Sequence, residues 1–229
     1  MIKTIAHFAD IHIEKSTARH EEYRIGFNRV IQKLEKQKPC RVIIVGDLFD
    51  DNLETSNEMY IIAGNFLREI SSLTKKLIIT TGNHDININN TTRVNSIQAV
   101  IENLNINNIF YLNKSGFYID ENVIWVVHDF VDKQNPWVEI MKNHVDKSFL
   151  FKNLDMSDYK NEIKKDNLKE FFKKYKKINL YHNPINGCIY PNQTEANSDK
   201  YRSLNDFYGD MLLMGDIHKK QYFNKKKYE

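Results

Sequence analysis

The chain has 229 residues, 41% of them hydrophobic, and a formal net charge of +3 with a sequence pI near 8.6. This length predicts one domain, residues 1–229, with one substantial core. The mild positive charge is compatible with a polyanionic partner. No apolar run is long enough to span a bilayer and the N-terminus lacks a signal-peptide pattern, so we expect a cytoplasmic or nucleoid-associated protein without a membrane partner.

The first half of the chain alternates between apolar runs and amphipathic stripes. Apolar, mostly β-branched runs predict buried strands at residues 5–9, 42–45 and 77–81. Apolar residues at helical spacing predict helices over residues 23–34, 59–70 and 97–104. Thr55 and Glu58 form a predicted capping box ahead of the second helix. This alternation of strand and helix is typical of a parallel sheet.

The second half contains more short strands. They are predicted at residues 109–112, 117–119, 123–127, 178–181 and 211–214. The doubling of strands fits a second sheet packed against the first. Ahead of the predicted strand at residues 178–181, an apolar helix face is formed by Leu168, Phe171 and Phe172 and is surrounded by lysines. We interpret these lysines as a solvated face rather than as phosphate contacts.

Polar residues of the metal-ligand type follow five of the predicted strands. They are Asp10 and His12, Asp47, Asn83 with His84 and Asp85, His182, and Asp216 with His218. Each motif alone has an ordinary explanation, such as a turn, a helix cap or, for His182, a structural histidine. Strand ends are where an α/β sheet delivers functional groups. The set of motifs in this order therefore predicts a site for two metal ions.

The chemistry of these donors narrows the choice of ion. Mixed oxygen and nitrogen donors without thiolate suit a site for Mn²⁺, Fe²⁺ or Zn²⁺ of the catalytic type. They suit a closed structural zinc site less well. A carboxylate can bridge two ions, and such a pair activates water for in-line attack on phosphorus. The donor set thus favours phosphoester hydrolysis.

The series from Asp10-x-His12 to Gly215-Asp-Ile-His218 resembles the calcineurin-like metallophosphoesterase superfamily. Within it, Val45-Gly-Asp-Leu-Phe-Asp-Asp-Asn52, followed by Ser56, is most similar to the SbcD-type DNA-repair nucleases. The resemblance implies an α/β fold, an αββα sandwich of two mixed β-sheets flanked by helices.

The resemblance also implies a role for each site residue. One metal would be held by Asp10, His12 and His218, the second by Asn83 and His182, with Asp47 bridging the two. His84 would contact the phosphate and protonate the leaving oxygen, as an imidazole can near neutral pH. Asp85 would orient its ring. The cofactors would be two divalent ions, Mn²⁺ first, with Mg²⁺, Fe²⁺ or Zn²⁺ as the other options.

One position departs from the nuclease pattern. The branch usually has Gly-His-x-His at the last motif, and Asp216 replaces the first of these histidines. A carboxylate still binds hard divalent ions, so we expect Asp216 to ligate the second metal and to favour Mn²⁺ or Mg²⁺. The alternative is that Asp216 faces away and that the second metal binds weakly.

These features predict a metal-dependent phosphodiesterase that cleaves DNA as an exonuclease and endonuclease in repair or recombination. The alternatives are a phosphatase or small-molecule phosphodiesterase on the same site, and a non-catalytic scaffold. By resemblance, the partners would be DNA, an SbcC-type coiled-coil ATPase and a second copy of the chain. The resemblance implies a DNA-capping and ATPase-docking region after His218, so we also expect a truncated chain that binds duplex DNA poorly.

Overall fold

The computed structural model describes residues 1–131, 134–141, 151–154 and 168–223. The chain divides into two compact units, Met1–Asn113 and Lys114–Glu229. The expectation of a single domain stays a prediction. Among the helices in the described ranges, none combines the length and the apolar composition needed to cross a membrane.

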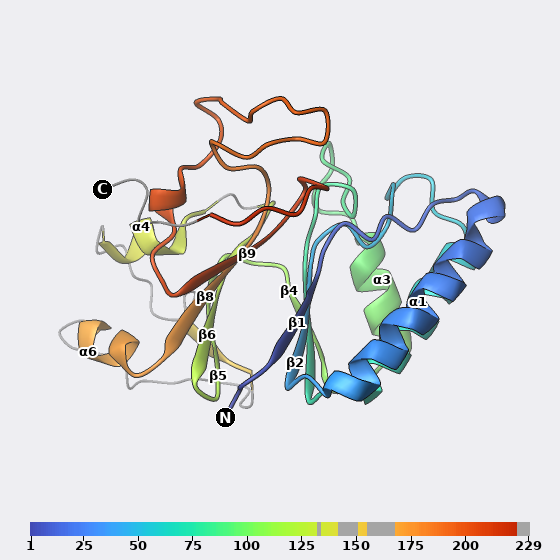
Figure 1. Ribbon diagram of the computed structural model, residues 1–229, viewed down its shortest axis with the longest axis horizontal. Coiled ribbons are helices and arrows are strands. Elements are labelled where there is room, and N and C mark those ends of the chain that lie inside the picture. Colours follow the sequence, from blue (N-terminus) through green and yellow to red (C-terminus); the bar gives the residue numbers. More distant parts are fainter. Residues whose placement is uncertain (132–133, 142–150, 155–167, 224–229) are drawn as a thin grey trace. The chain divides into compact units, whose positions relative to one another are not determined.

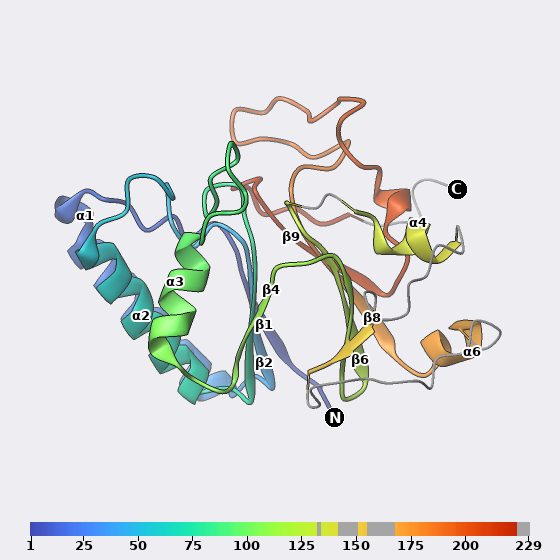
Figure 2. The same cartoon turned by 180° about the vertical axis from the view of Figure 1, so that it is seen from behind.

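The first unit contains a four-stranded sheet in the order β1-β2-β3-β4, and every neighbouring pair is parallel. The strands are β1 (Ile5–Phe8), β2 (Arg41–Val45), β3 (Lys76–Thr80) and β4 (Ile109–Leu112). The helices that follow the first three are α1 (Thr17–Gln37), α2 (Asn57–Ser72) and α3 (Ser96–Leu104). Right-handed crossovers in sequential order put all three helices on one face of the sheet (Figures 1 and 2).

The core of the first unit lies between this face and the helices. Alternate strand residues such as Val42 and Ile44 point into it, as period-two side-chain alternation requires. The helices supply buried residues such as Phe66, whose ring stacks on Phe27 of α1 with centroids 3.9 Å apart. The packed layer fixes the strands, and with them the loops that follow their carboxyl ends.

The second helix begins one residue later than the predicted capping box implied. Its N-cap is Ser56, whose hydroxyl accepts a hydrogen bond from the Met59 N–H at 3.4 Å. The Met59 sulfur accepts from the Ser56 N–H at 3.3 Å and completes the reciprocal pair. The Thr55 hydroxyl is instead directed to the Tyr60 hydroxyl.

The second unit contains a five-stranded mixed sheet in the order β7-β5-β6-β8-β9. Its strands are β5 (Gly116–Asp120), β6 (Val123–His128), β7 (Phe151–Asn153), β8 (Lys176–His182) and β9 (Met211–Gly215). Only the β5–β6 pair is antiparallel among these pairings. The helices are α4 (Pro136–Met141) and α6 (Leu168–Lys173), with a 3₁₀ turn, η2 (Leu204–Asp206). Both α-helices lie on the same side of this sheet (Figures 1 and 2).

The predicted α/β class with two sheets and flanking helices is confirmed, with two differences in detail. The first sheet is parallel throughout rather than mixed, and the strand at 109–112 belongs to it as β4. In α6, Phe171 and Phe172 pack on the core of the second unit as predicted, and Lys173 forms an exposed pair with Glu170 at 2.6 Å. Lys164 and Lys165 lie outside the described residues.

Candidate metal centre

The loops after β1 and β2 run side by side beyond the strands. The Ile11 N–H donates to the Asp47 carbonyl at 2.8 Å, and the Ile13 N–H donates to the Leu48 carbonyl at 3.0 Å. Ile13 also forms a parallel bridge with Phe49. The residues that this extended pairing places at one edge of the first unit are Asp10, His12 and Asp47.

The backbone at these positions is left-handed. Asp10, His12 and Asp47 have φ values of 54°, 48° and 51°. In the second unit, Asp216 and His218 have φ values of 82° and 49°. Within the described ranges, five of the nine non-glycine residues with positive φ are therefore predicted site residues. Residues in this region cluster at functional sites, where the surrounding structure holds the chain in an unfavourable conformation.

The three candidate donors of the first unit lie near one another in pairs. Ligand atoms of Asp10 lie within 4.8 Å of those of His12 and of Asp47. His12 Nε2 and Asp47 Oδ2 are 3.5 Å apart. Donors that share an ion at roughly 2.0–2.2 Å are themselves roughly 3–3.5 Å apart. Two carboxylates and one imidazole without thiolate are a suitable donor set for Mn²⁺ or a similar ion.

The absence of a side chain at Gly82 leaves room for Asp47. A Cβ atom on Gly82, which follows β3, would come within 2.1 Å of Asp47 Oδ1 and 2.3 Å of its backbone nitrogen. Asp47 Oδ1 also accepts a hydrogen bond from the His84 N–H at 3.0 Å. The loop after β3 therefore packs its bare backbone against the carboxylate, and any side chain at position 82 would displace it.

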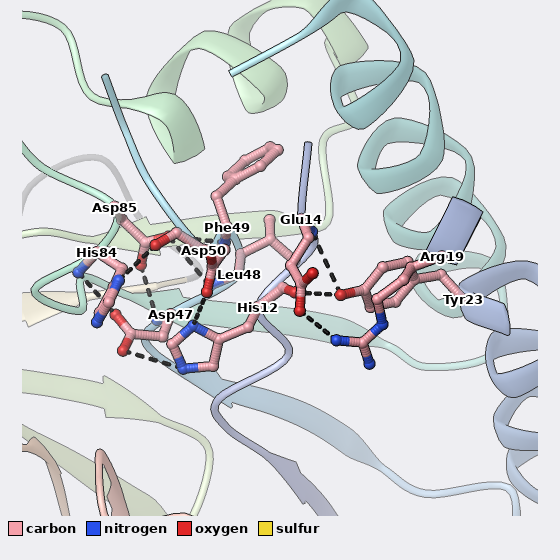
Figure 3. A network of polar contacts seen from close by, with 10 residues as sticks. All are labelled: His12, Glu14, Arg19, Tyr23, Asp47, Leu48, Phe49, Asp50, His84 and Asp85. Atoms are coloured by element: carbon pink, nitrogen blue, oxygen red, sulfur yellow. Dashed lines mark hydrogen bonds and ion pairs between the residues drawn. The ribbon is translucent and has the colours of Figure 1, made fainter. Parts of the chain in front are cut away.

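Asp85 is completely buried, and its carboxylate accepts hydrogen bonds from four backbone N–H groups. Its Oδ1 takes those of Leu48 and Phe49 at 3.0 and 3.2 Å, and its Oδ2 takes those of Asp47 and Gly82 at 2.8 and 3.0 Å. These groups belong to the loops after β2 and β3. One side chain thus ties the two loops together (Figure 3).

These contacts of Asp85 are not the ones that the resemblance implies. The resemblance predicts that Asp85 orients the ring of His84, but its oxygens bond to the backbone. The partner of His84 Nδ1 is the carbonyl of Asp50 (Figure 3). The His84 ring lies edge-on to His12 at a centroid distance of 4.8 Å, and His84 is exposed.

Asp50 is a residue that the sequence analysis did not assign to the site. Its Oδ1 lies 3.2 Å from His12 Nδ1, in addition to its carbonyl contact with His84. The signal was present in the sequence, because Asp50 and Asp51 follow the Asp47 motif directly. Nothing in their spacing distinguished Asp50 from its neighbour.

Helix α1 holds the loop after β1 from the other side. The Tyr23 hydroxyl donates to the His12 carbonyl at 2.5 Å and accepts from the Glu14 N–H at 3.3 Å. Partial burial raises the pKa of Tyr23, so the hydroxyl keeps its proton and remains a donor. Arg19 pairs with the Glu14 carboxylate (Figure 3). The His12 backbone is therefore fixed on both sides.

The second unit carries three more of the predicted donors, at the carboxyl edge of β8 and β9. His182 ends β8, where it is 2% exposed and lies opposite Gly215 in the parallel register. Asp216 and His218 follow directly after β9. Asn83, in the first unit, is partly exposed. Metal binding by these residues stays a prediction.

His128, at the end of β6, is buried in a polar network. Its Nε2 lies 3.0 Å from Asn179 Oδ1, which also accepts from the Trp137 indole at 2.8 Å. Its Nδ1 lies 2.6 Å from the Arg202 guanidinium. Burial lowers the pKa of His128 to about 3, although the bond to Asn179 opposes this shift. The ring is therefore neutral and accepts a hydrogen bond from Arg202.

Comparison with known proteins places the chain in a family. It belongs to the calcineurin-like phosphoesterase family, whose pattern it matches over residues 3–220. This is a family of metal-dependent phosphoester hydrolases, which agrees with the candidate ligands of the first unit.

Two individual proteins are similar to this chain. Uncharacterized protein R555 of Acanthamoeba polyphaga mimivirus is 31% identical over 231 residues, which cover 99% of this chain. The chain spans only 15% of the length of that relative. The crystal structure of the nuclease MPE of Pseudomonas putida has 18% sequence identity and a TM-score of 0.36, covering 54% of this chain and 52% of that one.

Proposed function

We propose that this phosphoesterase is a metal-dependent phosphodiesterase that cleaves DNA. The observation that carries the hydrolytic part is the meeting of Asp10, His12 and Asp47 beside the exposed ring of His84. The choice of DNA is supported by the similarity of residues 45–56 to the SbcD-type nucleases. DNA and an SbcC-type ATPase are the partners that this similarity implies.

The proposed cofactor is a pair of divalent ions, with Mn²⁺ as the first choice. Asp10, His12 and His218 would hold one ion, Asn83, His182 and Asp216 the other, and Asp47 would serve both. When bound, the ions supply positive charge at the phosphate and lower the pKa of the attacking water.

The protein's own residues supply the proton. With Nδ1 of His84 directed to the Asp50 carbonyl, Nε2 is the nitrogen left to give a proton to the leaving oxygen. The backbone N–H of His84 donates to Asp47 Oδ1, so the proposed acid in the loop after β3 is tied to the proposed bridging carboxylate in the loop after β2. Asp85 maintains this spacing by holding the loops after β2 and β3 together.

The decisive experiment compares substrates in the presence and absence of Mn²⁺. Labelled single- and double-stranded DNA should be degraded with Mn²⁺ and remain intact with EDTA. Bis(4-nitrophenyl) phosphate and 4-nitrophenyl phosphate test small diesters and monoesters. Turnover of the small esters with intact DNA would contradict the DNA assignment. Binding of Mn²⁺ without turnover of any substrate would contradict the phosphodiesterase itself.

Metal stoichiometry tests the least usual ligand. Asp216→Ala should lower the number of tightly bound Mn²⁺ ions from two towards one and raise the Mn²⁺ concentration needed for activity. Asp216→His should restore binding, because imidazole is also a ligand for these ions. Elemental analysis after gel filtration measures the stoichiometry. Two tightly held ions in the alanine variant would show that Asp216 is not a ligand.

A further inference from the structure

The segment that follows β9, residues 217–223, alternates between covered and exposed side chains. The covered ones, buried or partly buried, are Ile217, Lys219, Gln221 and Phe223. The exposed ones are His218, Lys220 and Tyr222. The odd-numbered residues therefore face the rest of the second unit, and the even-numbered ones face solvent.

The covered side chains fasten this segment to the loop of residues 183–203, which follows β8. Gln221 Oε1 accepts from the Ile189 N–H at 2.8 Å, and Gln221 Nε2 donates to the Ile189 carbonyl at 2.8 Å. Lys219 Nζ donates to Gln193 Oε1 at 2.9 Å. Phe223 packs against a hydrophobic cluster of the second unit. The backbone that carries the exposed side chains is thus held at three successive covered positions.

The exposed side chains combine a cation with an aromatic ring. Lys220 Nζ lies 5.4 Å from the centroid of the Tyr222 ring, within the range of a cation–π contact. Tyr222 is 85% exposed, which makes it the most exposed large hydrophobic residue in the part of the chain that the structure describes. At this exposure the ring contributes little to packing, although the backbone beside it is fastened.

We propose that Lys220 and Tyr222 form a contact site for single-stranded DNA. An exposed aromatic ring can stack on an unpaired base, and a lysine beside it can contact the phosphate of the same strand. A duplex keeps its bases stacked on one another, so it cannot offer a base face to the ring. His218, a proposed metal ligand, is exposed in the same segment, two residues before Lys220. The proposal rests on the proposed function for the choice of DNA, and it adds a preference for unpaired strands.

The test measures the binding of fluorescein-labelled oligothymidylate to the full chain by fluorescence anisotropy. EDTA is present, so that the DNA stays intact. Tyr222→Ala should weaken binding ~5–100-fold, which is the scale of one base–aromatic stack. Tyr222→Phe keeps the ring and should stay within about two-fold of wild type. The matched control is Tyr208→Ala, which removes another exposed tyrosine of the same unit and should also stay within about two-fold.

The lysine is tested by the salt dependence of binding. Each phosphate contact to a single strand adds about 0.7 to the slope of log K against log salt concentration. Lys220→Gln should lower this slope by about that amount. Lys174→Gln removes an exposed lysine beside α6 and should leave the slope unchanged. Equal slopes in wild type and Lys220→Gln would remove the lysine from the site.

Three results would overturn the inference. They are wild-type affinity in Tyr222→Ala, a loss in Tyr222→Phe as large as in Tyr222→Ala, and a wild-type protein that binds the oligothymidylate no better than a duplex of the same length. Failure of the proposed function gives a different result. A wild type that binds the oligothymidylate through Tyr222 but does not cleave DNA with Mn²⁺ would contradict the nuclease activity and leave the contact site standing.

Discussion

Each of the two units has a buried polar side chain that connects several segments, and the two side chains are of different kinds. In the first unit the central group is a carboxylate, Asp85, which accepts four backbone N–H bonds from two loops. In the second it is an amide, Asn179, which accepts from His128 and Trp137 and donates to the carbonyls of Tyr208 and Met211.

The difference follows from what surrounds each group. A carboxylate only accepts, so it suits a place where several backbone N–H groups converge. An amide both donates and accepts, so Asn179 can connect rings on one side with carbonyls on the other. The first unit therefore surrounds its candidate catalytic residues with charge, whereas the second surrounds His128 with neutral partners and a single guanidinium. Four substitutions examine this contrast.

The largest effect is expected for the exposed histidine of the first unit. His84→Gln removes the proposed acid, so DNA cleavage at saturating Mn²⁺ should fall ~10²–10⁴-fold. Metal stoichiometry should stay unchanged, because His84 is not a proposed ligand. The matched variant is His128→Gln in the second unit, which should keep activity within a few-fold. Equal losses in the two variants would mean that the catalytic proton does not come from His84.

Replacing the carboxylate of the first unit should cost stability. In Asp85→Asn, an NH₂ group faces two of the four N–H donors, and unsatisfied buried donors cost about 1–3 kcal/mol each. We expect the free energy of unfolding to fall by about 2–5 kcal/mol in urea titrations. The control Asp51→Asn changes an exposed carboxylate that accepts one local hydrogen bond. It should shift the free energy of unfolding by less than about 0.5 kcal/mol. An Asp85→Asn protein as stable as wild type would refute the tying role.

The neutral network of the second unit should respond to acid. Folding lowers the pKa of His128 to about 3 from its ordinary 6.5, so the unfolded chain binds more protons between these values. The contribution of the neutral ring is fully present above about pH 6.5 and is lost as the pH falls towards 3. Below pH 6, the free energy of unfolding should fall more steeply with decreasing pH in wild type than in His128→Gln. The difference between the two slopes should be on the order of 1 kcal/mol per pH unit. Parallel curves for the two proteins would contradict a neutral buried ring.

The smallest change in covalent structure is a single methyl group in the loop after β3. Gly82→Ala places a Cβ against the Asp47 carboxylate, so the loops must shift, at about 1–3 kcal/mol, and Mn²⁺ affinity should fall. Gly26→Ala adds the same methyl group in α1, where nothing lies within 4 Å. This control should gain up to about 1 kcal/mol of helix stability. Equal thermal midpoints and metal affinities in the two variants would rule out a tight contact at Gly82.

The fold was predictable where one pattern decided the answer. The runs around Val42 and Leu77 are apolar and mostly β-branched, and they form the central parallel strands β2 and β3. The helix stripe that includes Phe27 became α1. By contrast, β7 is the three-residue strand Phe151–Asn153, and a Phe-Lys-Asn run has no period to detect. Its pairing with β5 depends on contacts distant in sequence.

The residue types of the candidate site were predictable from the sequence, but the hydrogen-bond partners of these residues were not. The residue types of Asp10, His12 and Asp47, placed after strands, were enough to predict that they meet at one edge. The partners of Asp85 and Asp50 were not predictable, because both contacts join loops about 35 residues apart through backbone groups that every residue carries. A sequence pattern indicates which side chains are available, and it does not indicate which backbone atoms they meet.

The left-handed backbone of the candidate ligands has a further consequence. An L-residue in this region costs roughly 1–2 kcal/mol that glycine would avoid, although Asp tolerates it better than His. If only folding mattered, His12 and His218, with φ values of 48° and 49°, would be natural places for glycine. A deep mutational scan can measure the abundance of each variant separately from its activity. Glycine at these two positions should be tolerated or enriched in the abundance measurement and depleted in the activity measurement. Such a divergence would be independent evidence that the imidazoles are retained for work other than folding.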